Sequence, residues 1–202
     1  MLKISVMVLC ALSLFPASVL SRTTPTPPAE DKVTALLIID IQDFYFPGGA
    51  LPLVGSEAAG RNAARILEKF RKEGRLVIHV GHNAKNNMGF YEAVAPKSGE
   101  KVFYKNEVNA FNGTELLSYL REQKVRRLVI MGMQTHMCVE AAVRAASDLG
   151  FECILVGDAC ATRNLKYKNR QISAEDVHDA TLSTLEGTYA TVVDTETFLS
   201  TY

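Results

Sequence analysis

The sequence predicts one α/β domain: a three-layer, doubly wound sandwich with a mainly parallel sheet of about six strands. Short apolar runs alternate along the chain with longer segments whose apolar residues recur at helical spacing. The short runs are largely apolar, without alternation of polar residues, as expected for strands that helices cover on both faces. A hydrophobic content of 48% in 202 residues is enough for one complete core, and no internal repeat points to a second domain.

The expected elements follow one another in a regular order. Strands are expected at the apolar runs 35–39, 76–80, 101–104, 128–131, 153–156 and 190–193. Helices are expected at 57–73, 114–124, 135–149, 173–185 and 195–199. Thr135 is the expected N-cap of the third helix, and Ser173 with Asp176 forms a capping-box-like start of the fourth. The polar segments 81–101 and 161–171 are expected as loops.

The first residues have the composition of a secretory signal peptide. Lys3 gives a positive start, residues 4–15 are apolar, and Val19 and Ser21 suit the positions before a cleavage site. The sequence therefore predicts a signal peptide at 1–21, a flexible spacer at 22–32 and the folded domain at 33–202. The expected location is secreted or periplasmic, without stable membrane insertion after processing. An uncleaved membrane anchor is the alternative, because residues 2–20 are nearly long enough to span a bilayer.

The charge distribution excludes some partners. Acidic and basic residues balance at 22 each, and no dense cluster of Lys and Arg occurs. This balance argues against binding to nucleic acid or to an anionic membrane surface.

Cys138 has the position of a nucleophile. It follows the strand expected at 128–131 and lies at the start of the next helix, where free N–H groups and the helix dipole favour a thiolate. A small buried core residue is the alternative. Cys153 and Cys160 bracket an apolar run that holds them too far apart to form a disulfide with each other.

Asp40 and Lys105 follow two other expected strands. Residues just past the ends of parallel strands converge on one crevice, so we expect both to lie near Cys138. There a carboxylate can take the thiol proton, and a lysine can hold the carboxylate in its charged form. Alternatively, Asp40 is a cap or turn residue and Lys105 a solvated surface lysine.

Three segments together resemble a known family. Residues 37–44, 104–116 and 132–140 are similar to the three signature blocks of the isochorismatase-like cysteine hydrolases, in the same succession. That family includes nicotinamidases, N-carbamoylsarcosine and ureidoacrylate amidohydrolases, and streptothricin hydrolase. The resemblance implies a Rossmann-like sheet, a homo-oligomer, and an Asp-Lys-Cys triad of Asp40, Lys105 and Cys138.

The resemblance also implies further site residues. It places a cis peptide at Met133–Gln134 and an oxyanion hole at the backbone N–H groups of Gln134 and Cys138. Phe44 and Phe111 match positions that wall the substrate pocket, although both are equally suited to the core. Asn109 lies in the same block as Phe111 and is a candidate donor to a substrate amide. His136, at the start of the nucleophile helix, is a candidate substrate contact.

No metal or other cofactor is expected. Nicotinamidases carry an Asp-x-His and a further histidine as metal ligands, whereas residues 43–60 contain no histidine. His79 and His82 are three positions apart at a strand end, so they do not face one ligand together. His79 is expected in the core, and His82 is a candidate for the mouth of the pocket.

The predicted function is hydrolysis of a C–N bond in a small amide, ureido or lactam-like substrate through a thioester on Cys138. A non-catalytic small-molecule binding protein of the same fold is one alternative. An isochorismatase-type hydrolase is another, although true isochorismatases lack the cysteine. A thiol redox sensor is a third, and no Cys-x-x-Cys pattern supplies its resolving cysteine.

Overall fold

The computed structural model of the protein describes residues 33–83 and 89–202. The described residues belong to one compact unit. The signal-peptide and spacer predictions for residues 1–32 lie outside the described residues. No helix in the described part of the chain is long and apolar enough to cross a bilayer.

The main sheet has six strands in the order β3-β2-β1-β4-β5-β8, and neighbouring strands pair in parallel. Their bounds are β1 (Thr34–Ile39), β2 (Leu76–His82), β3 (Lys101–Lys105), β4 (Arg127–Met133), β5 (Glu152–Ala161) and β8 (Thr191–Val193). Each predicted apolar run therefore lies in a strand, except that Ala190 precedes β8, and the predicted α/β fold is confirmed. The strand order reverses direction between β1 and β4, which is where ligands bind in open parallel sheets.

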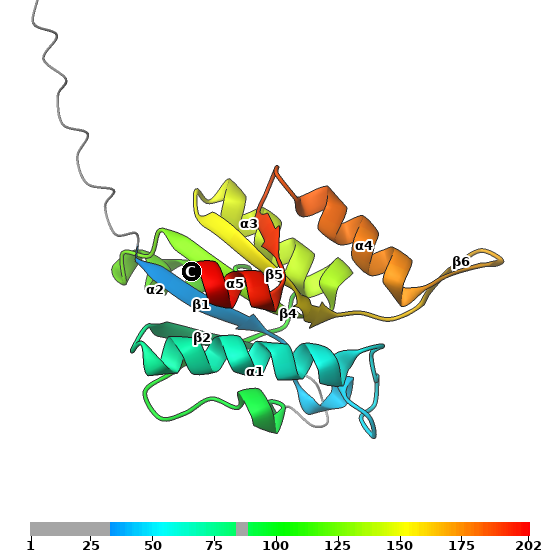
Figure 1. Cartoon of the computed structure of the whole chain (residues 1–202), viewed down its shortest axis with the longest axis horizontal. Coiled ribbons are helices and arrows are strands. Elements are labelled where there is room, and N and C mark those ends of the chain that lie inside the picture. Colours follow the sequence, from blue (N-terminus) through cyan, green and yellow to red (C-terminus); the bar gives the residue numbers. More distant parts are fainter. Residues whose placement is uncertain (1–32, 84–88) are drawn as a thin grey trace, which may run out of the picture. The chain divides into compact units, whose positions relative to one another are not determined.

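Helices cover both faces of the sheet (Figure 1). On one face, α1 (Ser56–Lys72) packs with α5 (Thr195–Thr201) through the stacked rings of Phe70 and Phe198. On the other face lie α2 (Leu116–Glu122), α3 (Glu140–Asp148) and α4 (Ala174–Leu185). Arg121 of α2 donates a hydrogen bond to the carbonyl of Leu149 at the end of α3. The Ser173 hydroxyl accepts from the backbone N–H of Asp176, so the predicted cap of α4 is present.

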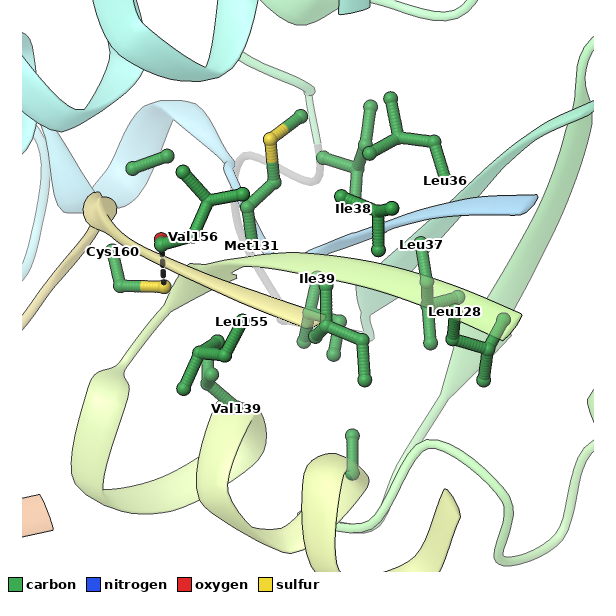
Figure 2. Close-up of a cluster of buried hydrophobic side chains, with 14 of the residues drawn as sticks. Leu36, Leu37, Ile38, Ile39, Leu128, Met131, Val139, Leu155, Val156 and Cys160 are labelled. Atoms are coloured by element: carbon green, nitrogen blue, oxygen red, sulfur yellow. Dashed lines mark hydrogen bonds between the residues drawn. The ribbon is translucent and has the colours of Figure 1, made fainter. Parts of the chain in front are cut away.

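The core shows why the strands are apolar on both sides. Along β1, Leu36 and Ile38 point toward one helix layer, whereas Leu37 and Ile39 point toward the other (Figure 2). All four side chains are fully buried. β1 is thus enclosed by neighbouring strands at its edges and by helices on its faces, which fixes the position where it ends.

One segment differs from the expected loop. Residues 161–171 include the antiparallel pair β6 (Leu165–Tyr167) and β7 (Arg170–Ile172). A two-residue turn with Lys168 in the left-handed region, at φ 54°, closes this hairpin. The segment is polar and mostly exposed, so it carries no apolar alternation from which the strands could be predicted. Short 3-10 turns, η1 (Asp43–Tyr45) and η2 (Glu92–Val94), lie after β1 and β2.

Candidate active site

The three side chains singled out from the sequence meet at one buried point. Asp40 follows β1, Lys105 ends β3, and Cys138 lies in the helical turn η3 (Thr135–Val139) that follows β4. Lys105 Nζ donates to Asp40 Oδ2 at 2.8 Å and to Cys138 Sγ at 3.3 Å. The exposed fractions are 0% for Asp40, 1% for Lys105 and 6% for Cys138. The structure thus brings the predicted triad together, while its catalytic role stays a prediction.

The structure contradicts the alternative for Lys105, a solvated surface residue, and agrees with the alternative for Asp40, a turn residue. Burial of Lys105 at 1% exposure contradicts the solvated surface lysine. Asp40 does form a turn, because it has φ 50° and its carbonyl accepts from the N–H of Gln42 at 2.9 Å. Aspartate enters this left-handed region more readily than most residues do. Asp40 therefore ends β1 and carries a buried charge at the same time.

The turn that carries Cys138 is wider than expected. η3 is a π-helical turn in which the N–H of Val139 reaches the carbonyl of Gln134 at 3.3 Å, and α3 begins only at Glu140. The prediction that Thr135 caps this helix is wrong: the N-cap is Gln134, without a side-chain cap. The reason is a competing partner, since Thr135 Oγ1 lies 2.9 Å from Nδ1 of His178 on α4.

The thiol of Cys138 is not stabilised as a thiolate. Burial and then the negative charge of Asp40 raise the pKa of Cys138 to about 12, while Lys105 acts in the opposite direction. Burial and the charge of Asp40 thus oppose the thiolate that the helix start was expected to favour. At neutral pH the resting nucleophile is therefore a thiol, and it needs a base.

Asp40 can serve as that base. Burial raises the pKa of Asp40, and the charge of Lys105 opposes the rise. Lys105 occupies Oδ2, while Oδ1 has no hydrogen-bond partner among the described residues. One carboxylate oxygen is thus anchored, and the other is available for a proton.

Gln134 lies between β4 and η3, after the cis peptide that the resemblance implied at Met133–Gln134. Its side-chain Nε2 donates to the Tyr45 hydroxyl at 3.4 Å, and its Oε1 accepts from Arg163 Nε at 3.1 Å. Tyr45 and Arg163 were not predicted from the sequence. They come from η1 and from the segment after β5, and both fix the residue whose N–H group was predicted for the oxyanion hole.

Two predicted substrate contacts, Phe44 and His136, lie near Tyr45 and Arg163 respectively. The half-buried ring of Phe44 packs against Tyr45, with ring centroids 4.1 Å apart. His136 Nδ1 lies 2.6 Å from Thr162 Oγ1, and burial followed by the charge of Arg163 lowers the pKa of His136. His136 is therefore a neutral, half-buried group in the turn that carries Cys138.

For Phe111 and Asn109, the structure shows contacts with residues outside the triad. Phe111 stacks on Phe151 with ring centroids 6.3 Å apart, and Phe151 precedes β5, at the opposite end of that strand from the triad edge. This contact favours the core alternative for Phe111. Asn109 Oδ1 accepts from the N–H of Phe111 at 3.0 Å, so its side-chain oxygen stabilises the local turn.

His82 is closer to the triad than the sequence indicated. Its Nδ1 lies 3.3 Å from Lys105 Nζ, at the point where β2 ends between β1 and β3. His79 is fully buried in the core, as expected, and its Nε2 lies 2.9 Å from Glu100 Oε2. The strand register places His82, and not His79, opposite Lys105.

A cavity of about 210 Å³ lies beside the site but does not include the triad. Its walls come from the start of α1, the start of α4 and the end of β5, and they include Val54, Asp158, Cys160 and His178. Among residues 33–83 and 89–202, no group of three or more His, Cys, Asp or Glu side chains is arranged to hold a metal ion.

Comparison with known proteins gives the family of this chain. The family model of the isochorismatase domain matches residues 34–197. The isochorismatase family protein YddQ of Bacillus subtilis is 42% identical over 177 residues, which cover 82% of this chain and 98% of YddQ. Maleamate amidohydrolase of Pseudomonas putida is 31% identical over 184 residues, covering 79% of this chain and 82% of that enzyme.

A solved structure gives the same result for the fold. The crystal structure of an isochorismatase from Pseudomonas putida KT2440 superposes with a TM-score of 0.78 at 35% identity, covering 85% of this chain and 93% of that one. The match of the family model extends over most of the chain and includes all six strands of the main sheet. This chain therefore belongs to the isochorismatase-like hydrolase family.

Proposed function

We propose that the protein hydrolyses the C–N bond of a small amide or ureido compound, with Cys138 as the nucleophile. One observation carries the proposal: a buried lysine donates at the same time to a buried carboxylate and to a buried thiol. Burying charges is costly, so a protein that needed only stability would be served as well by apolar side chains here. The arrangement is instead suited to moving one proton between Asp40 and Cys138.

The first half of the reaction breaks the C–N bond. Asp40 takes the proton of the Cys138 thiol, and the thiolate attacks the substrate carbonyl carbon to form a C–S bond. The negative charge passes to the carbonyl oxygen. When the C–N bond breaks, Asp40 gives its proton to the departing nitrogen, which leaves ammonia or an amine and a thioester on Cys138.

The second half restores the enzyme. Asp40 takes a proton from water, and the resulting hydroxide attacks the thioester carbonyl. The C–S bond then breaks, the acid product leaves, and Asp40 returns the proton to the sulfur. Lys105 stays bonded to both groups, so the negative charge that moves between carboxylate and sulfur always faces the same ammonium.

The oxyanion is assigned to backbone donors. Gln134 directly precedes the turn that carries the nucleophile, and Cys138 lies within that turn, so both N–H groups belong to the same short segment. The two hydrogen bonds on the Gln134 side chain hold this turn to η1 and to the segment after β5. Donors fixed in this way need no reorganisation as negative charge develops on the carbonyl oxygen.

The substrate class follows from the chemistry and from a relative. A thioester route requires an acyl carbonyl that carries a leaving group, such as the nitrogen of an amide, and Phe44 beside Tyr45 offers an aromatic wall. The relative named maleamate amidohydrolase supports an amide rather than a vinyl ether as the substrate of this chain. A screen of primary amides and ureido compounds for release of ammonia tests this assignment directly.

Covalent trapping tests the nucleophile. A small electrophilic amide analogue is incubated with the protein, and the adduct is located by peptide mass spectrometry. We expect the label on Cys138, loss of hydrolysis in Cys138→Ala, and unchanged hydrolysis in Cys153→Ala. Cys153 is a matched control because it is also buried and burial also raises its pKa to about 12. Labelling that persists unchanged in Cys138→Ala would overturn the proposal.

A further inference from the structure

The side chain of Lys105 reaches its partners over the end of an intervening strand. Lys105 ends β3 and Asp40 follows β1, while β2 lies between these two strands. Neighbouring strands are about 4.8 Å apart, so β1 and β3 are separated by roughly two strand spacings, and the side chains of Lys105 and Asp40 meet over the end of β2. The last residue of β2 is His82, and it lies opposite Lys105 in the strand register. His82 is therefore the residue over which these side chains meet.

The contact between His82 and Lys105 provides a third acceptor for the Lys105 ammonium. An ammonium has three N–H groups. The acceptors around Lys105 Nζ are Asp40 Oδ2 at 2.8 Å, Cys138 Sγ at 3.3 Å and His82 Nδ1 at 3.3 Å. Lys105 has no acceptor function, so His82 Nδ1 must be unprotonated and the neutral ring must carry its proton on Nε2.

The backbone of His82 is fixed by a buried glutamine. Gln42 Oε1 accepts from the N–H of His82 at 2.7 Å, and Gln42 Nε2 donates to the carbonyl of His82 at 3.2 Å. Gln42 is fully buried, and its own N–H donates to the carbonyl of Asp40 at 2.9 Å. On the other side, the N–H of Asn83 donates to the carbonyl of Lys105 at 2.8 Å. These bonds hold His82 to Gln42, which follows β1, and hold the next residue, Asn83, to Lys105 at the end of β3.

We propose that His82 is a positioning residue that keeps the Lys105 ammonium directed at Asp40 and Cys138 by accepting its third hydrogen bond. The inference rests on the proposed function, because it gives His82 a role through Lys105 and not through the substrate. Without the third acceptor, the ammonium can rotate about the end of its flexible chain. It then spends part of the time away from the sulfur that it has to stabilise.

The test compares two substitutions of His82. Asparagine places an amide oxygen close to the position of Nδ1, so His82→Asn keeps the acceptor, whereas His82→Leu removes it. Loss of one hydrogen bond to a charged group predicts a kcat about tenfold lower in His82→Leu, with KM unchanged. His82→Asn is expected to recover most of this loss. If His82→Leu does not fold, His82→Gln replaces it, because its longer amide does not match Nδ1.

Two readouts do not depend on turnover. In wild-type protein, ¹H–¹⁵N correlation spectra of the imidazole rings should show Nδ1 of His82 unprotonated, assigned by comparison with His82→Asn. Lys105 lowers the pKa of the Cys138 thiol, so a loosened lysine should slow the alkylation of Cys138 by iodoacetamide at a fixed pH. We expect slower alkylation in His82→Leu and near-normal alkylation in His82→Asn.

These readouts separate the two proposals. A proton on Nδ1 of His82, or wild-type alkylation and wild-type kcat in His82→Leu, would overturn the positioning role. A purely structural role predicts a lower melting temperature in both variants, without rescue by asparagine. If wild-type protein hydrolyses no amide, the proposed function fails, and the spectra and alkylation rates still decide whether His82 holds Lys105.

Discussion

At the scale of single residues, Asp40 has two opposing effects on Cys138. Asp40 is the base proposed for Cys138, and its negative charge also raises the pKa of that thiol. The carboxylate therefore keeps Cys138 as a thiol until a substrate carbonyl can accept the electron pair of the sulfur. Lys105 opposes both pKa shifts, because it stabilises the ionised form of either partner. The three groups form one titrating unit, and its apparent pKa values belong to the unit as a whole.

Substitution of Asp40 should separate thiol ionisation from catalysis. In Asp40→Asn the negative charge disappears, so the pKa of Cys138 should fall while hydrolysis is lost together with the base. The measurement is the rate of alkylation by iodoacetamide against pH, with Cys138→Ala as the background. We expect the main rise in rate at lower pH in Asp40→Asn than in wild type. A rise at the same or a higher pH would show that Asp40 does not act on the thiol.

Substitution of Lys105 should affect stability as well as rate. The pair of Lys105 and Asp40 is fully buried, and breaking such a pair costs about 3–5 kcal/mol, so Lys105→Met should lose this stability. The unpaired Asp40 has its pKa raised in the folded state, so it binds more protons there than in the unfolded state. The free energy of unfolding therefore falls as pH rises above the ordinary carboxyl range, and recovers toward acid pH.

Thermal unfolding of Lys105→Met at several pH values checks this prediction. The matched control is the double variant Asp40→Asn/Lys105→Met, which lacks the buried charge and should lose the pH dependence that the single variant gains. An equal loss of melting temperature in both variants at every pH would contradict the prediction.

At the scale of elements, one glycine keeps β4 in contact with β1. Gly132 has φ 142° and pairs with Ile39, and a Cβ at this position would collide with the Ile39 carbonyl. Asp40 is the next residue after Ile39, so any displacement there moves the proposed base. The bulge between β4 and β5 lies at the same place, between Ile130 and Gly132.

Gly132→Ala should therefore reduce both stability and activity. Overpacking a buried position costs about 1–3 kcal/mol, and the unfavourable φ adds to this cost. Gly150→Ala is the control, since Gly150 also has a positive φ, 84°, but its Cβ would meet no atom within 4 Å. We expect a larger loss of melting temperature in Gly132→Ala, with a lower kcat, and near-normal kcat in Gly150→Ala. Equal effects would show that the collision is relieved elsewhere.

The elements also show what sequence can and cannot predict. Asp40, Lys105 and Cys138 were found because each follows an apolar run, and strand ends in a parallel sheet share one edge. Gln42 was not assigned, and His82 was expected only at the mouth of the pocket, because their contacts depend on β2 lying between β1 and β3. The Thr135 cap was wrong because a histidine from α4 takes its hydroxyl. Local pattern predicts the elements, whereas strand order and competition among partners decide the contacts.

At the scale of the whole molecule, burial of the thiols is compatible with the predicted export. Cys138, Cys153 and Cys160 are unpaired, and all are buried. Burial is the main reason that the pKa of each thiol is raised to about 12. Oxidation proceeds through the thiolate, so these cysteines are protected in an oxidising compartment without forming disulfides.

This leads to a prediction for the mature protein. If residues 1–21 are a signal peptide, export removes Cys10 and leaves a chain that begins at Arg22. Intact mass spectrometry of the exported protein should therefore give the mass of residues 22–202. Titration of the denatured protein under non-reducing conditions should find the thiols of Cys138, Cys153 and Cys160 and no fourth. A Ser21→Tyr variant, with a bulky residue before the expected cut, should remain unprocessed and keep Cys10. A full-length wild-type chain in the membrane fraction would favour the uncleaved anchor, and fewer free thiols would show that burial does not protect them.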